Sequence, residues 1–171
     1  MANVNVAVAQ VPLPANAGRS KRVLIVDKGC WVEAASGPST GAFVLFNRLG
    51  MTTSRVVSID VDATARQVGR HMNPKTRAFP GLDHSVKSLD HVTEQFIIGL
   101  GPVNLYTSGT PCGDFSILKT APVKDPRHNN RRDGLEGNTG RLFKVSIQVW
   151  NWIRKHNEQA VGIFEMVNFD P

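Results

Sequence analysis

The sequence predicts a doubly wound α/β fold with a mainly parallel sheet, and three observations lead to it. Short β-branched or apolar runs alternate with segments of helical periodicity along most of the chain. Polar or glycine-rich turns follow these runs, as at the strand-to-helix junctions of βαβ units. Of the 171 residues, 41% are hydrophobic and 20% are charged, which is ordinary for one soluble globular domain.

Each expected strand is a short run that suits a buried parallel sheet. The strands are expected over 22–26, 55–60, 103–106 and 160–164. Asp27, Lys28 and Gly29 would end the first strand, and Asp60 ends the second. Because parallel strands end at the same edge of a sheet, ligands of this fold bind at their carboxyl ends. The segment 27–41, Asp60, the turn 107–116 and Glu165 would therefore meet there.

Each expected helix repeats apolar residues at helical spacing. The helices are expected over 42–49, 62–72, 90–100 and 140–156. Gly50 would cap the first helix, and Pro74 would break the second. One face of the longest helix carries Leu142, Val145, Val149, Trp152 and Ile153. The one long loop, over 116–138, is of a length that is usually functional or mobile.

The chain divides into a flexible tail over 1–20 and one domain over 21–171. The tail lacks a basic start and contains Pro12 and Pro14, so it does not read as a signal peptide. No apolar run approaches the roughly 18 to 20 residues that a membrane span needs. The two cysteines are far apart and lack zinc-type neighbours, so neither a disulfide nor a metal site is expected. A formal charge of +6 favours an acidic partner, with nucleic acid first.

Two residues at expected strand ends carry the strongest chemical signals. Cys112 follows Pro111 just after a strand, so its thiol should stand at the working edge of the sheet as a nucleophile. The alternative is a small buried thiol. Glu165 ends the last strand, where partial desolvation would let it hold or share a proton. The alternative is a carboxylate that caps the next element.

Three further features are weaker. An acid at the position of Asp60 often binds ribose hydroxyls, although a solvated turn carboxylate fits equally well. The turn over 37–41 could bring backbone N–H groups to a ligand, but it is not a GxGxxG motif. The loop 116–138 suits a DNA backbone or a solvated surface. Its basic residues are Lys119, Lys124, Arg127, Arg131 and Arg132. Cys30 has no supporting neighbours and is assigned no role.

Three segments stand in an order and spacing that is specific. Residues 108–116 read Ser-Gly-Thr-Pro-Cys-Gly-Asp-Phe-Ser, and residues 134–143 begin Gly-Leu-Glu-Gly and end Thr-Gly-Arg-Leu-Phe. Residues 164–167 read Phe-Glu-Met-Val. Together they resemble the DNA cytosine-5 methyltransferases, most closely the catalytic domains of the animal de novo enzymes. The resemblance covers about residues 22–167, with residues 28–33 as an apparent insertion and residues 81–86 as the third cofactor segment.

The resemblance implies a Rossmann-like S-adenosylmethionine-dependent fold, incomplete at its C-terminus, that methylates carbon 5 of cytosine in DNA. Cys112 would attack carbon 6 of a flipped-out cytosine, while Glu165 protonates or hydrogen-bonds ring nitrogen 3. The residues implied to bind S-adenosylmethionine are Gly37, Ser39, Thr40, Gly41, Asp60, Asp83 and Pro111. Those implied to bind DNA are Ser116, Lys119, Arg131 and Arg132.

The resemblance leaves two interpretations open. In the first, the chain is a catalytic fragment or subunit, because the family's target recognition region and final helix would lie after residue 171. A second chain could supply the target recognition region. In the second, the chain is a catalytically impaired binding or regulatory module, because Ala35 and Met166 stand where the family has Phe and Asn. An unrelated α/β cysteine enzyme would need a histidine base, and none of the five histidines is convincingly placed for that role. The expected location is nuclear in a eukaryote and cytoplasmic otherwise.

Overall fold

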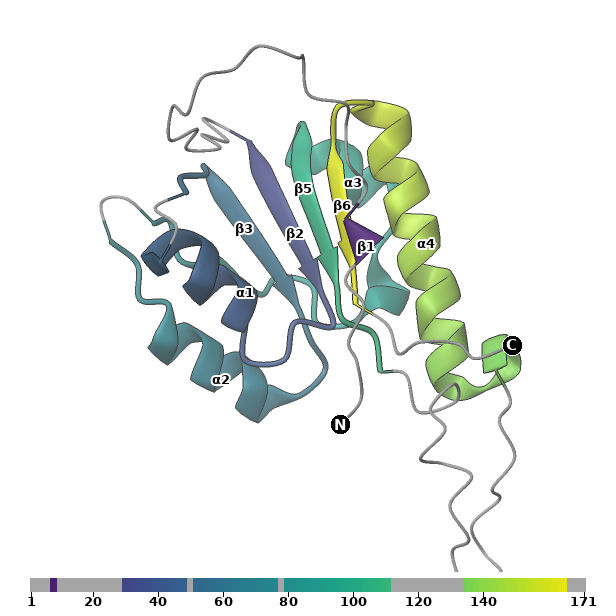
Figure 1. Cartoon of the computed structure of the whole chain (residues 1–171), viewed down its shortest axis with the longest axis horizontal. Helices are drawn as coiled ribbons and strands as arrows, with labels where there is room; N and C mark the ends of the chain where they lie inside the picture. The colour runs from purple at the N-terminus through teal and green to yellow at the C-terminus, as the bar shows by residue number, and fades with distance from the viewer. Residues whose placement is uncertain (1–6, 9–28, 49–50, 77–78, 112–133, 166–171) are drawn as a thin grey trace, which may run out of the picture.

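The centre of the molecule is a parallel sheet (Figure 1). The computed structural model describes residues 7–8, 29–48, 51–76, 79–111 and 134–165. Its parallel strands are β2 (Cys30–Ala34), β3 (Arg55–Ile59), β4 (Leu82–Asp83), β5 (Val103–Ser108) and β6 (Val161–Phe164). They lie in the order β6-β5-β2-β3-β4, and β1 (Ala7–Val8) pairs antiparallel with β6.

This strand order is that of a Rossmann-like, doubly wound sheet. The chain starts the parallel sheet at its centre with β2, winds outward to β4, and returns to the other side of β2 with β5 and β6. The reversal leaves a topological switch point between β2 and β5, which is where such folds bind ligands. The α/β fold class predicted from the sequence is confirmed.

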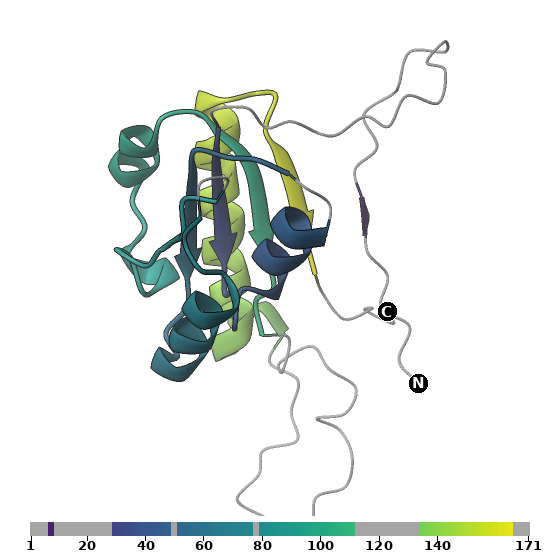
Figure 2. The same ribbon diagram turned by 90° about the vertical axis from the view of Figure 1, so that its left-hand side faces the viewer.

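Helical segments connect the strands. They are α1 (Thr40–Ala42), which continues into the π-helical η1 (Phe43–Arg48), then α2 (Ala63–Met72), the 3-10 turn η2 (Leu89–His91), α3 (Glu94–Leu100), the 3-10 turn η4 (Gly134–Glu136) and α4 (Asn138–His156). Figure 1 shows α1 and α2 beside the β3 side of the sheet and α4 along the β6 side. Figure 2 shows α1 and α3 on opposite sides of the strands.

Two hydrophobic clusters fill the space on either face of the sheet. On one face, Val32 of β2 and Tyr106 of β5 belong to the same cluster as Val149 of α4. On the other face, Trp31 and Leu105 cluster with Ala42, and Phe46 packs against them. Successive residues of β2 thus enter opposite clusters because strand side chains alternate between the faces. Both faces of β2 are buried, as expected for the central strand of a parallel sheet.

Two predicted elements need correction. The strand that leads into the turn over 37–41 is Cys30–Ala34, so residues 30–33 belong to the sheet and are not an insertion. The expected strand over 22–26 lies outside the described residues. The expected helix over 90–100 is interrupted, because the extended residue Val92 ends the η2 turn and the hydroxyl of the next residue, Thr93, caps α3 by accepting the Phe96 N–H.

Two other observations bear on the predicted boundaries, and a third concerns membrane spans. The fifth strand extends to Ser108, two residues past the expected end at Tyr106. Residues 7–8 of the predicted tail lie against the sheet through their pairing with β6. None of the helices in the described ranges is long and apolar enough to cross a membrane.

Candidate functional site

The carboxyl ends of four strands lie level at one edge of the sheet. Ala34 is opposite Ile59 on one side and Ser108 on the other, and Ser108 is opposite Phe164. Backbone hydrogen bonds continue this alignment past the strand ends: the Gly109 N–H donates to the Ala34 carbonyl at 3.2 Å, and the Glu165 N–H donates to the Ser108 carbonyl at 2.8 Å. The residues that follow β2, β5 and β6 are therefore held together.

A cavity of about 760 Å³ opens at this edge, beside the switch point. Its size is within the range of about 300 to 1,000 Å³ that small-molecule sites occupy. The described residues that line it come from β2, the turn that follows β2, α1, η1, and the ends of β5 and β6. They are Trp31, Glu33, Ala34, Ala35, Ser36, Gly37, Thr40, Gly41, Val44, Leu45, Thr107, Ser108, Gly109, Ile163 and Glu165.

The turn after β2 wraps the edge of the cavity. Its backbone is left-handed at Ala35, Gly37 and Ser39, with φ of 50°, 52° and 54°. Such angles are easy for glycine but uncommon for alanine and serine, so surrounding contacts must hold the turn. Asp60 provides one of these contacts, because its Oδ2 accepts the Gly37 N–H at 2.8 Å. Its Oδ1 accepts the Asp62 N–H at 2.8 Å, so both oxygens already brace the backbone.

The predicted cofactor residues divide into two groups. Gly37, Thr40 and Gly41 line the cavity. Ser39, by contrast, is fully buried, and its hydroxyl bonds the Ser58 hydroxyl at 2.7 Å beneath the turn. Asp60 and the exposed Pro111 lie at strand ends but are not among the described residues that line the cavity.

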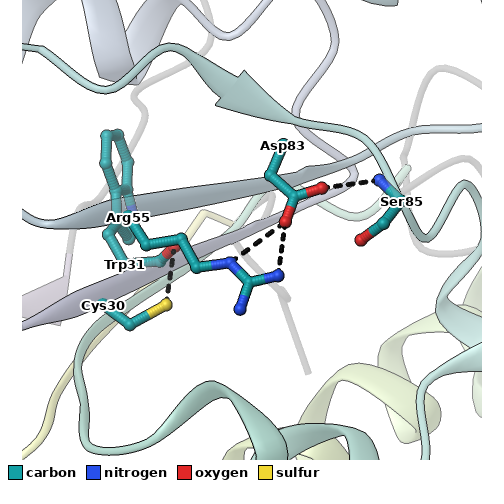
Figure 3. A network of polar contacts seen from close by, with 5 residues as sticks. All are labelled: Cys30, Trp31, Arg55, Asp83 and Ser85. Atoms are coloured by element: carbon teal, nitrogen blue, oxygen red, sulfur yellow. Dashed lines mark hydrogen bonds and ion pairs between the residues drawn. The ribbon is translucent and has the colours of Figure 1, made fainter.

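Asp83 does not reach the cavity either. Its Oδ2 accepts hydrogen bonds from Arg55 Nε at 3.0 Å and Nη2 at 2.6 Å, and its Oδ1 accepts the Ser85 N–H at 2.8 Å (Figure 3). Arg55 is the first residue of β3, so it draws the carboxylate toward the amino end of that strand. These hydrogen bonds hold the pKa of Asp83 below its ordinary value despite partial burial.

Cys30 lies in the same neighbourhood (Figure 3). The thiol is 3% exposed, and burial raises its pKa to about 11. A thiol that remains protonated at neutral pH is a poor nucleophile, which agrees with the absence of any role assigned from the sequence.

Glu165 lies at the mouth of the cavity but is exposed. The sequence predicted partial desolvation there, and this expectation is wrong for the described structure because no described element covers the end of β6. Its Oε2 comes within 3.7 Å of the position that a Cβ on Gly109 would occupy. Glu165 and the residues just before Pro111 therefore share one wall of the cavity.

The desolvated carboxyl of the site is Glu33, which the sequence analysis missed. Its side chain is 6% exposed, lines the cavity, and lies 2.7 Å (Oε1) from where a Cβ on Gly41 would stand. Burial raises the pKa of Glu33 to about 7, although contacts with the Ser39 hydroxyl and the Ala42 amide act in the opposite direction. The available signal was a charged residue inside a buried run that leads directly into a glycine-rich turn.

A chain of buried hydroxyls supports the end of β5 from below. The Tyr106 hydroxyl and the Ser146 hydroxyl of α4 are 2.7 Å apart, and Ser146 donates to the Ser108 hydroxyl at 2.7 Å. Burial raises the pKa of Tyr106 to about 12, so the phenol stays neutral. The longest helix is thereby fastened to the strand that ends four residues before Cys112.

Several predicted residues lie outside the described part of the chain. They are the nucleophile candidate Cys112, the DNA-contact candidates Ser116, Lys119, Arg131 and Arg132, and the departure from the family pattern at Met166. Within the described ranges, no group of three metal-ligating side chains is placed to hold a metal ion. No family model matches the chain.

Proposed function

We propose that this chain carries the catalytic centre for transfer of a methyl group to carbon 5 of cytosine in DNA. The observation that carries the proposal is the hydrogen bond from the Glu165 N–H to the Ser108 carbonyl, together with the cavity that both residues line. This pairing ties the acid to the strand end that precedes Pro111 and Cys112 in the sequence. The resemblance to the cytosine-5 methyltransferases assigns the acid and the nucleophile to these same positions.

The cavity is compatible with S-adenosylmethionine, which would supply the methyl group when bound. Gly37, Thr40 and Gly41 offer a close-approaching backbone, and the cavity lies at the switch point where the fold binds nucleosides. Its described lining contains two carboxyl groups and no Lys, Arg or His, which disfavours a phosphate-bearing dinucleotide. Asp60 would bind ribose hydroxyls through the carboxylate lone pairs that do not accept the Gly37 and Asp62 N–H groups.

The chain's own residues would then perform a nucleophilic addition and its reversal. The Cys112 thiolate adds to carbon 6 of the flipped base, and a C–S bond forms. Glu165 protonates or hydrogen-bonds ring nitrogen 3, which stabilises the electron density that moves toward carbon 5. After methylation, a water molecule takes the proton from carbon 5, the C–S bond breaks, the thiolate is restored, and any proton donated to ring nitrogen 3 returns to Glu165. An exposed Glu165 suits this role before DNA binds, because the incoming base would supply the desolvation.

The test is transfer of labelled methyl groups to cytosine-containing DNA by the chain, alone and with a candidate partner that reads DNA. A partner is included because the resemblance spans catalytic motifs and not a target recognition region. The expected result is incorporation by the wild type that is lost in Cys112→Ser and falls by about 100-fold or more in Glu165→Gln, as for a removed proton donor. Incorporation that survives Cys112→Ser would exclude the mechanism.

A catalytically impaired binding module is the second candidate, and Ala35 favours it. Ala35 lines the cavity with a methyl group where the family places a Phe ring, so one aromatic contact to a bound ligand is lost. Such a module would bind S-adenosylmethionine weakly or not at all and would transfer no label. Calorimetry of Ala35→Phe beside the wild type distinguishes the two candidates, because a functional cavity should bind without the substitution.

A further inference from the structure

Glu33 is a buried carboxyl group with no positively charged partner among the described residues. Its side chain is 94% buried, and its Oε2 has neither solvent contact nor a hydrogen-bond partner in the structure. It arises from the middle of the sheet, on the central strand, rather than from a surface loop. Burying an ionised carboxylate without a partner costs free energy. The group therefore either stays protonated or ionises when a positively charged group binds beside it.

The described surroundings of Glu33 provide no such charge. The neighbouring charged group is Asp60, which is also an acid and makes ionisation of Glu33 harder. The second carboxyl that lines the cavity is Glu165, and no Lys, Arg or His is among the described lining residues. This contrasts with a chain that carries 20 Lys and Arg against 14 Asp and Glu. The cavity is therefore an acidic site in a basic protein.

The Trp31 ring forms part of the cavity wall beside Glu33. Trp31 precedes Glu33 by two residues on β2, so both side chains emerge on the same face. Its ring lies 3.5 to 3.6 Å from the position of a Cβ on Gly41, the same point that Glu33 Oε1 approaches to 2.7 Å. Faces of tryptophan attract cations, most strongly away from water. A carboxyl group and an indole ring thus converge next to Gly41.

We propose that Glu33, assisted by the Trp31 ring, recognises a positively charged group on the ligand of this cavity. Under the proposed function, on which this inference rests for the ligand's identity, that group is the sulfonium or the ammonium of S-adenosylmethionine. Glu33 would make the cavity select ligands by charge, separately from the contacts to the nucleoside part. A further consequence is proton release on binding, because a cation stabilises the ionised form of a carboxyl group that burial otherwise keeps partly protonated.

The experiment compares three ligands by calorimetry on the full chain near pH 7. Adenosine has no cation, S-adenosylhomocysteine has the ammonium alone, and S-adenosylmethionine has both charges. In Glu33→Gln, we expect binding of S-adenosylmethionine to weaken by about tenfold or more, while binding of adenosine changes by less than about twofold. Weaker binding of both S-adenosylhomocysteine and S-adenosylmethionine assigns the ammonium, and weaker binding of S-adenosylmethionine alone assigns the sulfonium.

Proton release is measured by repeating the titration in two buffers of different ionisation enthalpy. The wild type should release protons when the ligand binds, and Glu33→Gln should not.

Glu158→Gln is the matched control, because this carboxyl is exposed and lies outside the cavity. It should leave the binding of all three ligands unchanged, and circular dichroism should show that both variants fold. Equal weakening of adenosine and S-adenosylmethionine in Glu33→Gln would reduce Glu33 to a structural residue and overturn the proposal. Unchanged binding of S-adenosylmethionine would overturn it as well.

A second arm separates this proposal from the proposed function. Trimethylsulfonium chloride and ethylammonium chloride carry the two charges without a nucleoside. Each salt should raise the melting temperature of the wild type above that in sodium chloride of equal ionic strength, and should not do so in Glu33→Gln. If the cations act through Glu33 but no adenosyl ligand binds, charge recognition stands and the cofactor assignment fails. If neither small cations nor adenosyl ligands discriminate the variant, the charge-recognition proposal is refuted.

Discussion

Glu33 and Gly41 show how one residue of the site depends on another. The carboxyl of Glu33 occupies the space that a side chain on Gly41 would need, with Oε1 2.7 Å from the ideal Cβ position. Since Glu33 is buried and the indole of Trp31 lies beside it, a side chain on Gly41 would force the carboxyl out of its present position. Glycine is required here by close approach, and its φ angle plays no part.

Gly41→Ala should therefore destabilise the protein. We expect the free energy of unfolding to fall by about 1 to 3 kcal/mol, the usual cost of overpacking. Gly99→Ala is the control, because Gly99 is an exposed residue of α3 with nothing within 4 Å of its Cβ position. That change should stabilise the protein by about 0.5 to 1 kcal/mol through helix propensity. Urea unfolding measures both, and a neutral Gly41→Ala would contradict the packing described.

The raised pKa of Glu33 makes a separate prediction for stability against pH. The pKa rises from 4.5 to about 7 on folding, so the folded state holds its proton more tightly than the unfolded state does. Below about pH 4.5 Glu33 is protonated in both states, so its ionisation does not lower the free energy of unfolding. As the pH rises from 4.5 through 7, the unfolded state ionises first and the folded state loses about 3 kcal/mol relative to it.

Glu33→Gln removes this titration. The difference in unfolding free energy between Glu33→Gln and the wild type should increase in favour of the variant between pH 4.5 and 7, and then level off. Urea unfolding at several pH values in that window, without ligand, measures it. A difference that stays flat across the window would show that Glu33 is not desolvated as described.

At the scale of elements, the hydroxyl chain from Tyr106 through Ser146 to Ser108 joins α4 to β5. All three residues are buried, and the Tyr106 hydroxyl also donates to the Ser146 carbonyl at 3.2 Å. Ser146→Ala should cost about 1 to 3 kcal/mol, because the buried Ser108 hydroxyl loses this donor and the Tyr106 hydroxyl keeps only its bond to the backbone carbonyl of residue 146. The double variant Tyr106→Phe with Ser146→Ala should cost less than the sum of the single variants. Strict additivity in urea unfolding would mean that the chain is not a coupled unit.

The sequence predicted most elements because the spacing of their apolar residues matches the repeat of a helix or of a strand. The strand at 55–60 and the helices at 62–72 and 140–156 recur in the structure with ends shifted by one or two residues. The sequence did not predict β2, because this strand includes Trp31 and Glu33 and is less apolar than the run over 22–26. A buried charge in a strand is stabilised by tertiary contacts, which periodicity does not reveal. The break at Thr93 likewise depends on a cap that competes with a continuous helical pattern.

The candidate site could be predicted in outline for the same reason that the fold could. Parallel strands bring their carboxyl ends to one edge, so Gly37, Asp60, Gly109 and Glu165 were expected near one another. The sequence could not show that Arg55 would hold Asp83 away from this edge, because that ion pair joins residues 28 positions apart. It also could not show which of two carboxyls, Glu33 or Glu165, would be desolvated.

At the scale of the whole molecule, the charge distribution suits two partners of opposite sign. The chain as a whole is basic, with a formal charge of +6, while the described lining of the cavity is acidic. A basic surface favours association with a polyanion such as DNA, and an acidic cavity favours a cationic small molecule. The proposed methyl transfer needs both partners at once.

The most direct test of that account is covalent trapping on DNA that contains 5-fluorocytosine. Fluorine at carbon 5 cannot leave as a proton does, so the C–S bond formed by Cys112 would persist after methylation. The account predicts a denaturation-resistant protein–DNA adduct that requires S-adenosylmethionine, maps to Cys112 by peptide mass spectrometry, and is missing in Cys112→Ser. The wild type is tested with the same DNA-reading partner used in the transfer assay. No adduct in the wild type, or an adduct that persists in Cys112→Ser, would contradict it.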